Sequence, residues 1–335
     1  MRASLGADPI RFVDVGARGG WQPKWKKHAD LVTFVGVEPD SAECERLRRA
    51  GRPNEIFVDK ALYRSVGEVS LYHCEPPICS SIYPPNRKGT DRFIGPAHAT
   101  RLDRVESIPV TTFDLAIEPL GLGTIDFIKL DTQGSELDIL CGAERALAGP
   151  MVGLEVEVEF SPLYEGQPLF PEVAAHLGAR GFEFIDFPTM VSNARIRFGH
   201  RGAHGYPNLA AFVANWVSLV RARGALRPGN RLVYGDAIFL RERDAWLAAV
   251  QAEGPRARGQ GIRGLMTCCV VGYTDHALDL ARGLGEVGLL SGDEVESFVA
   301  YVEASIATWR YALEGVDRFA RRLAFRLRHL RSGTI

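Results

Sequence analysis

Short hydrophobic runs alternate with amphipathic stretches in the N-terminal half of the chain, which predicts a parallel sheet covered by helices on both faces. Between the runs, hydrophobic residues recur at helical spacing in 41–50 and 136–147, and Ser41 and Ser135 are placed to cap these crossover helices. Residues 231–240 alternate as a strand without a helix close before them, so we expect them to pair antiparallel with the run before them. The predicted strands of the parallel part are Ile10–Val15, Val32–Val37, Ile56–Val58, Val69–Tyr72, Ile125–Leu130, Met151–Val158 and Phe182–Phe187.

The pattern changes beyond about Arg243. Residues 253–264 are rich in Gly, Pro and Arg, which predicts a loop, and the following residues have helical periodicity. One hydrophobic stripe runs from Phe298 to Leu330, and the opposite face is rich in arginine. We therefore predict a first domain over residues 1–243 and a helical extension over 244–335. Three roles are open for this extension: packing on the first domain, a homodimer contact, or contact with an anionic membrane surface.

Composition narrows the classes of function. With 46% hydrophobic residues the chain can bury a core, so it is not a disordered protein. Its 40 basic and 41 acidic residues nearly cancel, which argues against general nucleic-acid binding. The sequence has no N-terminal signal pattern, no run long enough to span a membrane and no metal-ligand spacing, so we expect a cytoplasmic protein without a metal site.

The first predicted strand ends in a turn of small residues, and such a turn lets the backbone approach a ligand. Asp14 is followed by Gly16, Ala17 and, after Arg18, by Gly20. A dinucleotide site needs a second glycine where Arg18 stands, so the NAD interpretation weakens. A nucleoside cofactor without a pyrophosphate, such as S-adenosylmethionine, fits the turn better. A purely structural turn is the alternative.

Two later segments complete this predicted cofactor site. Glu38 follows the second strand at a spacing that lets an acid reach ribose hydroxyls, although a solvated acid at a strand end is the simpler interpretation. Asp59 and Ala61 follow the third strand, where an acid and a backbone amide can flank an adenine ring.

The predicted strand 125–130 delivers Asp131 to its carboxyl end, where open α/β sheets bind ligands. Glu155, Glu157 and Glu159 alternate along the next strand and so share one face. We choose Asp131 and Glu155 as a carboxylate pair that supplies a general base or holds a cation. The structural alternative is that Asp131 caps the following helix.

The chain resembles the FkbM-type methyltransferases of the class I S-adenosylmethionine-dependent superfamily over roughly residues 12–187. The resemblance is carried by the segments 12–17 with Gly20, 35–39, 80–81 and 126–143. It implies a seven-stranded sheet with a reversed last strand, S-adenosylmethionine at the ends of the first two strands, and O-methylation of a sugar or related hydroxyl. Asp14, Gly16, Glu38 and Asp131 occupy the matching cofactor or active-site positions.

Two residues depart from the family pattern. Arg18 stands where the family usually has Asn, and Thr132-Gln133 replaces a segment that usually carries an acid. The second departure moves the expected base role to Asp131 and Glu155.

Other residues are candidates for binding the acceptor. Ser80 and Ser81 lie in a loop that we expect to form one wall of the substrate pocket. A long segment before the last strand carries arginines that can recognise an anionic acceptor, such as an acidic or phosphorylated sugar, and its alternative is a solvated loop. Its candidate residues are Arg195, Arg197, His200 and His204.

The sequence thus predicts an S-adenosylmethionine-dependent enzyme that methylates a small-molecule or saccharide hydroxyl. A metabolite-binding module whose chemistry has decayed is the alternative that Gln133 keeps open, with the helical region recruiting a partner. A dinucleotide-dependent oxidoreductase is the third, and Arg18 counts against it.

Overall fold

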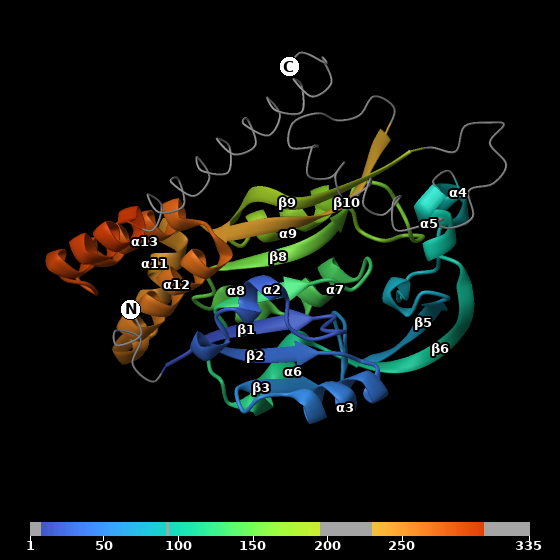
Figure 1. Ribbon diagram of the computed structural model, residues 1–335, viewed down its shortest axis with the longest axis horizontal. Helices are drawn as coiled ribbons and strands as arrows, with labels where there is room; N and C mark the ends of the chain where they lie inside the picture. Colours follow the sequence, from blue (N-terminus) through green and yellow to red (C-terminus); the bar gives the residue numbers. More distant parts are fainter. Residues whose placement is uncertain (1–7, 92–93, 195–229, 305–335) are drawn as a thin grey trace, which may run out of the picture.

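A computed structural model describes residues 8–91, 94–194 and 230–304 (Figure 1). Seven strands form the main sheet in the order β3-β2-β1-β7-β8-β10-β9. Neighbouring strands are parallel except that β10 runs antiparallel to both β8 and β9, so the predicted mostly parallel sheet with a reversed last strand is confirmed. The strands are β1 (Ile10–Val15), β2 (Val32–Val37), β3 (Glu55–Val58), β7 (Phe127–Leu130), β8 (Gly153–Glu159), β9 (Phe182–Ala194) and β10 (Asn230–Arg241).

A second sheet of three strands lies at the end of the molecule opposite α11–α13 (Figure 1). It contains β4 (Ala61–Leu62), β5 (Gly67–Cys74) and β6 (Leu102–Thr111), with β5 antiparallel to β6. The prediction that Val69–Tyr72 joins the parallel sheet is therefore wrong. A parallel crossover needs about a dozen residues or more, and only residues 59–66 separate β3 from β5.

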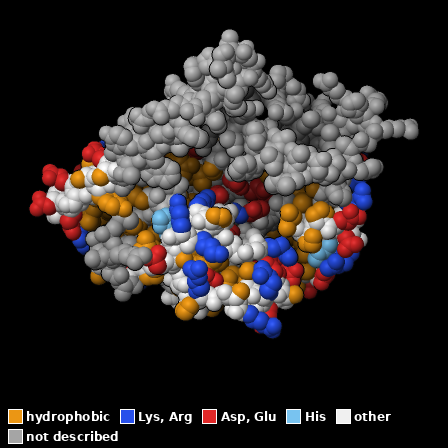
Figure 2. All heavy atoms as spheres, in the orientation of Figure 1, with side chains coloured by type: hydrophobic (Ala, Val, Ile, Leu, Met, Phe, Trp, Pro, Cys, Tyr) orange, Lys and Arg blue, Asp and Glu red, His pale blue; other side chains and the backbone are white. Residues whose placement is uncertain are grey.

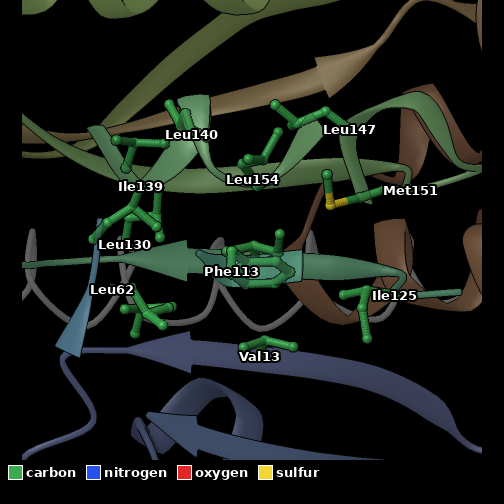
Figure 3. Packing of buried hydrophobic residues seen from close by; sticks show 14 of the residues in the cluster. Val13, Leu62, Phe113, Ile125, Leu130, Ile139, Leu140, Leu147, Met151 and Leu154 are labelled. Carbon is green, nitrogen blue, oxygen red and sulfur yellow. The ribbon is translucent and has the colours of Figure 1, made fainter. Parts of the chain in front are cut away.

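Helices cover both faces of the main sheet, and alternate strand residues point to each. One face packs residues such as Val13, Leu130 and Leu154 against the helices on that side (Figure 3). These helices are α6 (Phe113–Ile117), α7 (Glu136–Cys141), α8 (Glu144–Ala148) and α9 (Phe170–Gly178). Short helical segments complete the loops, namely η2 (Pro77–Cys79), α4 (Arg87–Thr90), α5 (Ile94–Ala99) and η3 (Glu118–Leu120).

The other face packs Phe12, Phe34 and Phe127 against α2 (Pro23–Lys26), α3 (Ser41–Ala50) and α12 (Ala257–Val271). The first crossover is short, since it holds only α2 and η1 (Ala29–Leu31). Met266 and Val270 of α12 pack on the same face.

A buried ion pair ties α12 to the sheet. Arg263 Nε lies 3.1 Å from Asp126 Oδ2, and Asp126 also accepts hydrogen bonds from the Arg11 backbone N–H and Gln260, both at 2.8 Å. Burial raises the pKa of Asp126, and the Arg263 charge opposes that rise. This part of the C-terminal region therefore belongs to the packing of the sheet.

The predicted loop over 253–264 is wrong beyond its first residues, because α12 begins at Ala257. Its glycines allow close helix packing: a Cβ on Gly264 would lie 2.2 Å from the Trp246 ring, and one on Gly261 would lie 2.9 Å from Leu284. The neighbouring elements are α11 (Arg243–Gln251), η4 (Gly254–Arg256) and α13 (Thr274–Glu286). The predicted stripe and basic face beyond residue 304 lie outside the described residues.

The crossover helices differ from the prediction at their ends. Asp40, not Ser41, caps α3, because its side chain accepts hydrogen bonds from the backbone N–H groups of residues 42 and 43. The predicted helix 136–147 is interrupted near Gly142, where a Cβ would lie 2.4 Å from the Tyr63 carbonyl oxygen. Ser135 makes no side-chain cap. Within the described ranges, no helix has the length and hydrophobicity needed to cross a bilayer.

Candidate active site

The turn after β1 touches both neighbouring strand ends. The backbone N–H groups of Gly16 and Ala17 donate to the carbonyl oxygen of Val37 at 3.0 and 3.1 Å. Gly16 has a φ of +85°, and a Cβ there would lie 2.1 Å from the carbonyl oxygen of Asp131. Only glycine fits this position, so the turn brings bare backbone against the end of β7.

The start of α3 fixes the rest of the turn. Glu43 accepts a hydrogen bond from the Gly19 backbone N–H at 2.9 Å, and Asp40 accepts one from Arg18 at 2.7 Å. Gly20 closes the turn through its N–H, which donates to Ala17 at 2.8 Å. The turn is therefore held by the end of β2 and by the start of α3.

Glu38 lies at the carboxyl end of β2 and is almost fully buried. Burial raises the pKa of its carboxyl, while the Asp40 N–H and the Arg18 charge oppose the rise. Both of these partners contact Oε1, at 3.0 Å and 3.4 Å. Among the described residues nothing donates a hydrogen bond to its Oε2, which leaves one carboxylate oxygen for a ligand.

Three charged side chains form a row across three adjacent strands. Asp14 of β1 lies beside Lys129 of β7, which lies beside Glu155 of β8. Lys129 Nζ is 2.9 Å from Asp131 Oδ2 and 3.9 Å from Asp14 Oδ1. Burial lowers the pKa of Lys129, but the carboxylates of Asp14 and Asp131 outweigh it, and the ammonium stays charged.

Asp14 forms the β1 end of this row and is buried. Burial raises its pKa to about 7, despite the opposing charge of Lys129. Its Oδ1 is buried and has no hydrogen-bond partner, although buried polar atoms nearly always have one. Such an orphaned oxygen marks a place where a ligand donor fits.

Helix α2 adds a second ammonium to the row. Trp25 stacks on Phe12 with ring centroids 4.0 Å apart and anchors the helix on the sheet. Lys24, the preceding residue, pairs with Glu155. The side chain of Lys24 is 33% exposed, whereas that of Glu155 is only 4% exposed.

Gln133 joins the end of β7 to that of β8. Its amide nitrogen donates to Glu157 at 2.7 Å and to Asp131 at 3.3 Å, while its amide oxygen lies 3.2 Å from the Tyr164 hydroxyl. Ser81 donates to its carbonyl oxygen at 2.6 Å. The φ of Gln133 is +61°, a strained value for a side-chain-bearing residue, so these contacts hold a defined conformation. An amide suits this place because it bridges two carboxyl groups.

More carboxyl groups extend the same region. Burial, followed by the neighbouring Asp131 and Glu136 charges, raises the pKa of Glu157 well above its usual value. Burial likewise raises the pKa of Glu159, Asp236 and Glu136, the last to about 7. Figure 2 shows acidic side chains gathered near the centre of one face, where Figure 1 places the carboxyl ends of β1 and β8. Across the residues that the structure describes, no group of His, Cys, Asp or Glu is arranged to hold a metal ion.

The remaining predicted site residues are distributed as follows. Asp59 lies between β3 and β4, and Ala61 begins β4, so both follow the strand that borders Glu38. Ser80 accepts a hydrogen bond from the Cys74 backbone N–H at 3.2 Å. Ser81 is buried, and its hydroxyl donates to the Gln133 carbonyl oxygen and accepts from the Tyr83 backbone N–H. Arg195, Arg197, His200 and His204 lie outside the described residues.

The predicted pair of Asp131 and Glu155 is separated by Lys129. Asp131 instead connects through Gln133 to Glu157. Lys24 and Lys129 also belong to this site, although neither was among the residues predicted for it. The sequence does carry a signal for Lys129, which is the one lysine in the hydrophobic run 125–130. A buried ammonium needs carboxylate partners, so its position indicates a charged cluster.

A scan against family models matches residues 14–184 to the methyltransferase FkbM domain, which is just over half of the chain. The chain belongs to the FkbM methyltransferase family. The predicted resemblance is thereby confirmed, and the family implies S-adenosylmethionine as the methyl donor. No curated protein sequence matches the chain.

Solved methyltransferase structures give weak overall likenesses. A chain in the complex of the Trm112 methyltransferase activator and a methyltransferase of Haloferax volcanii has 8% identity and a TM-score of 0.32, with 72% of this chain and 88% of that one covered. The 16S rRNA (adenine(1408)-N(1))-methyltransferase of Catenulisporales acidiphilia has 15% identity and a TM-score of 0.32, with 71% and 91% covered. The 30S ribosomal A1408 methyltransferase of an uncultured bacterium has 13% identity and a TM-score of 0.29, with 72% and 92% covered. Strand order and the family match, rather than these scores, therefore carry the assignment.

Proposed function

We propose that this FkbM methyltransferase transfers a methyl group from S-adenosylmethionine to a hydroxyl of a sugar, polysaccharide or related metabolite. One observation carries the proposal. Asp131 meets the donor turn at Gly16 through its backbone, while its side chain is 35% exposed at the same strand end. A carboxylate at this place can face both a methyl donor and an acceptor hydroxyl.

The residues present fit the donor. Gly16 allows the backbone approach, the free oxygen of Glu38 suits the ribose hydroxyls, and the orphaned oxygen of Asp14 suits the ammonium of the methionine part. Asp59 and Ala61 are assigned to the adenine side from their place after β3.

The donor supplies a methyl group on a sulfonium, which is already activated for transfer. The protein therefore has to align the acceptor and remove its proton. We assign proton removal to Asp131, held by Lys129 and Gln133, so that a new carbon–oxygen bond replaces the carbon–sulfur bond as the proton moves to the carboxylate.

The charge of the described face bears on the acceptor class. Asp131 directly follows β7, and the carboxyl groups of β8 and β10 lie beside it, namely Glu155, Glu157 and Asp236. Carboxylates accept hydrogen bonds from hydroxyl groups. A neutral, hydroxyl-rich acceptor suits this face better than an anionic one. Recognition of an anionic acceptor would depend on Arg195 and Arg197, which lie outside the described residues.

The test is transfer of an isotopically labelled methyl group from S-adenosylmethionine to neutral sugars, uronic acids and amines, with products located by mass spectrometry. We expect methyl ethers of neutral sugars. Asp131→Asn should lower kcat by about 100-fold while changing the dissociation constant of S-adenosylhomocysteine little. Asp103→Asn, an exposed change on β6, is the control. Products methylated on nitrogen would overturn O-methylation. Donor binding without transfer to any acceptor class would support the binding-module alternative.

A further inference from the structure

Lys24 and Glu155 form an ion pair on which the two residues depend to different degrees. Glu155 already lies beside the buried ammonium of Lys129 in the neighbouring strand. Lys24 comes from outside the sheet, on α2, and keeps a third of its side chain exposed. Lys24 is therefore the ammonium in this cluster that can change partner.

The other cations of the site are committed. Lys129 is enclosed between Asp14 and Asp131, with only 6% of its side chain exposed. Arg18 is held by Asp40 and Glu38. Arg18 is as exposed as Lys24 but pairs with two carboxylates away from the row, so among the described residues Lys24 is the exposed cation that pairs with the row itself.

The proposed donor carries an amino-acid end, with an α-ammonium and an α-carboxylate on one carbon. The orphaned Oδ1 of Asp14 offers an acceptor for the ammonium. A carboxylate bound beside it needs a cation, because the surroundings of Asp14 already include the negative charges of Asp131 and Glu155. Lys24 is close enough to influence Asp14 and carries the opposite charge.

We propose that Lys24 is the anchor for the α-carboxylate of the donor and that it exchanges Glu155 for this carboxylate when the donor binds. Glu155 then keeps Lys129 as its charged neighbour and presents a released oxygen on the face that we assign to the acceptor. The inference rests on the proposed function, since it assumes S-adenosylmethionine as the donor.

The consequence is a dependence of affinity on the carboxylate group of the ligand. S-adenosylhomocysteine carries the amino-acid end, whereas 5′-methylthioadenosine lacks it and keeps the nucleoside. Loss of Lys24 should weaken only the first ligand. Neutralising Glu155 should remove the competitor for Lys24 and strengthen the first ligand alone.

The experiment is calorimetric titration of the full chain with these two ligands. In Lys24→Met we expect the dissociation constant of S-adenosylhomocysteine to rise roughly tenfold, the scale of a lost charged hydrogen bond, with 5′-methylthioadenosine unchanged. In Glu155→Gln we expect the dissociation constant of S-adenosylhomocysteine to fall about threefold or more. Lys26→Met, on the exposed side of the same helix, is the matched control and should leave both ligands unchanged.

Equal weakening of both ligands in Lys24→Met, or no weakening of either, would overturn the anchor role. Weakening of S-adenosylhomocysteine in Glu155→Gln would overturn the exchange. Failure of the wild-type chain to bind S-adenosylhomocysteine at all would instead overturn the proposed function, so the two failures are distinguishable. Circular dichroism and thermal unfolding of each variant check that it is folded.

Discussion

Gly16 and Asp131 meet so closely that a single methyl group between them would collide with the peptide. A Cβ on Gly16 would lie 2.1 Å from the Asp131 carbonyl oxygen, and the backbone of Gly16 is left-handed. One backbone contact therefore links the turn that we assign to the donor with the residue that we assign as base.

Alanine substitutions at Gly16 and Gly19 distinguish the destabilisation caused by this close contact from that caused by the left-handed backbone. Gly19 also has a φ of +85°, but nothing lies within 4 Å of its Cβ position. We expect Gly19→Ala to lower the free energy of unfolding by about 1–2 kcal/mol and Gly16→Ala by about 2–5 kcal/mol. Urea unfolding measures both. Equal losses of unfolding free energy in the two variants would show that the close contact with Asp131 adds no destabilisation beyond that of the left-handed backbone.

Most strands of the main sheet and the glycine turn could be predicted because they depend on local patterns. Alternating hydrophobic runs identify strands such as Ile10–Val15 and Val32–Val37, whose bounds the structure reproduces. The first half of α12 could not be predicted, because its glycines weaken helix propensity and are explained only by their contacts with Trp246 and Leu284.

The candidate site was predicted in part for a similar reason. Asp14 lies near the end of a predicted strand, and Glu38 and Asp131 directly follow theirs, so their places at the carboxyl edge come from chain order alone. The partners of these residues depend on contacts between distant segments. Lys24 meets Glu155 across 131 positions of sequence, and no periodicity within either segment encodes that pairing.

Gln133 gives a test of the amide that replaces an acid. In Gln133→Glu a third carboxylate would stand between Asp131 and Glu157, and like charges raise each other's pKa. We expect the acidic limb of the pH–rate profile to move up by about one unit. Gln133→Met removes the bridge without adding charge, so kcat should fall with a smaller shift of the limb. Identical profiles in the two variants would contradict an electrostatic role.

The buried carboxyl of Asp14 makes stability depend on pH. Its pKa is raised from 3.8 to about 7 on folding, so the folded state binds more protons than the unfolded state between these values. The free energy of unfolding should therefore fall as pH rises from about 4 to 7, with a contribution of at most about 1.4 kcal/mol per pH unit from this group. Glu136 acts in the same direction. Urea unfolding across this range should show a shallower decline in Asp14→Asn, and an unchanged slope would contradict the assignment.

Breaking the buried ion pair between α12 and the sheet should strongly destabilise the protein, although the pair lies far from the candidate site. Arg263→Met leaves Asp126 buried without its cation, which costs about 3–5 kcal/mol for a buried pair. Arg256→Met, at an exposed position just before the helix, should change stability by less than about 0.5 kcal/mol. Denaturant unfolding compares the two. A small effect of Arg263→Met would mean that α12 is not needed to hold the sheet.

The central claim is that the carboxyl ends of β1 and β2 bind the methyl donor. Calorimetric titration with S-adenosylhomocysteine, with NAD as the control ligand and Glu38→Gln as the variant, tests it most directly. We predict saturable one-to-one binding of S-adenosylhomocysteine alone, weakened about tenfold or more in Glu38→Gln because the ribose loses a charged acceptor. Absence of binding, or equal affinity in the folded variant, would contradict the assignment of this site.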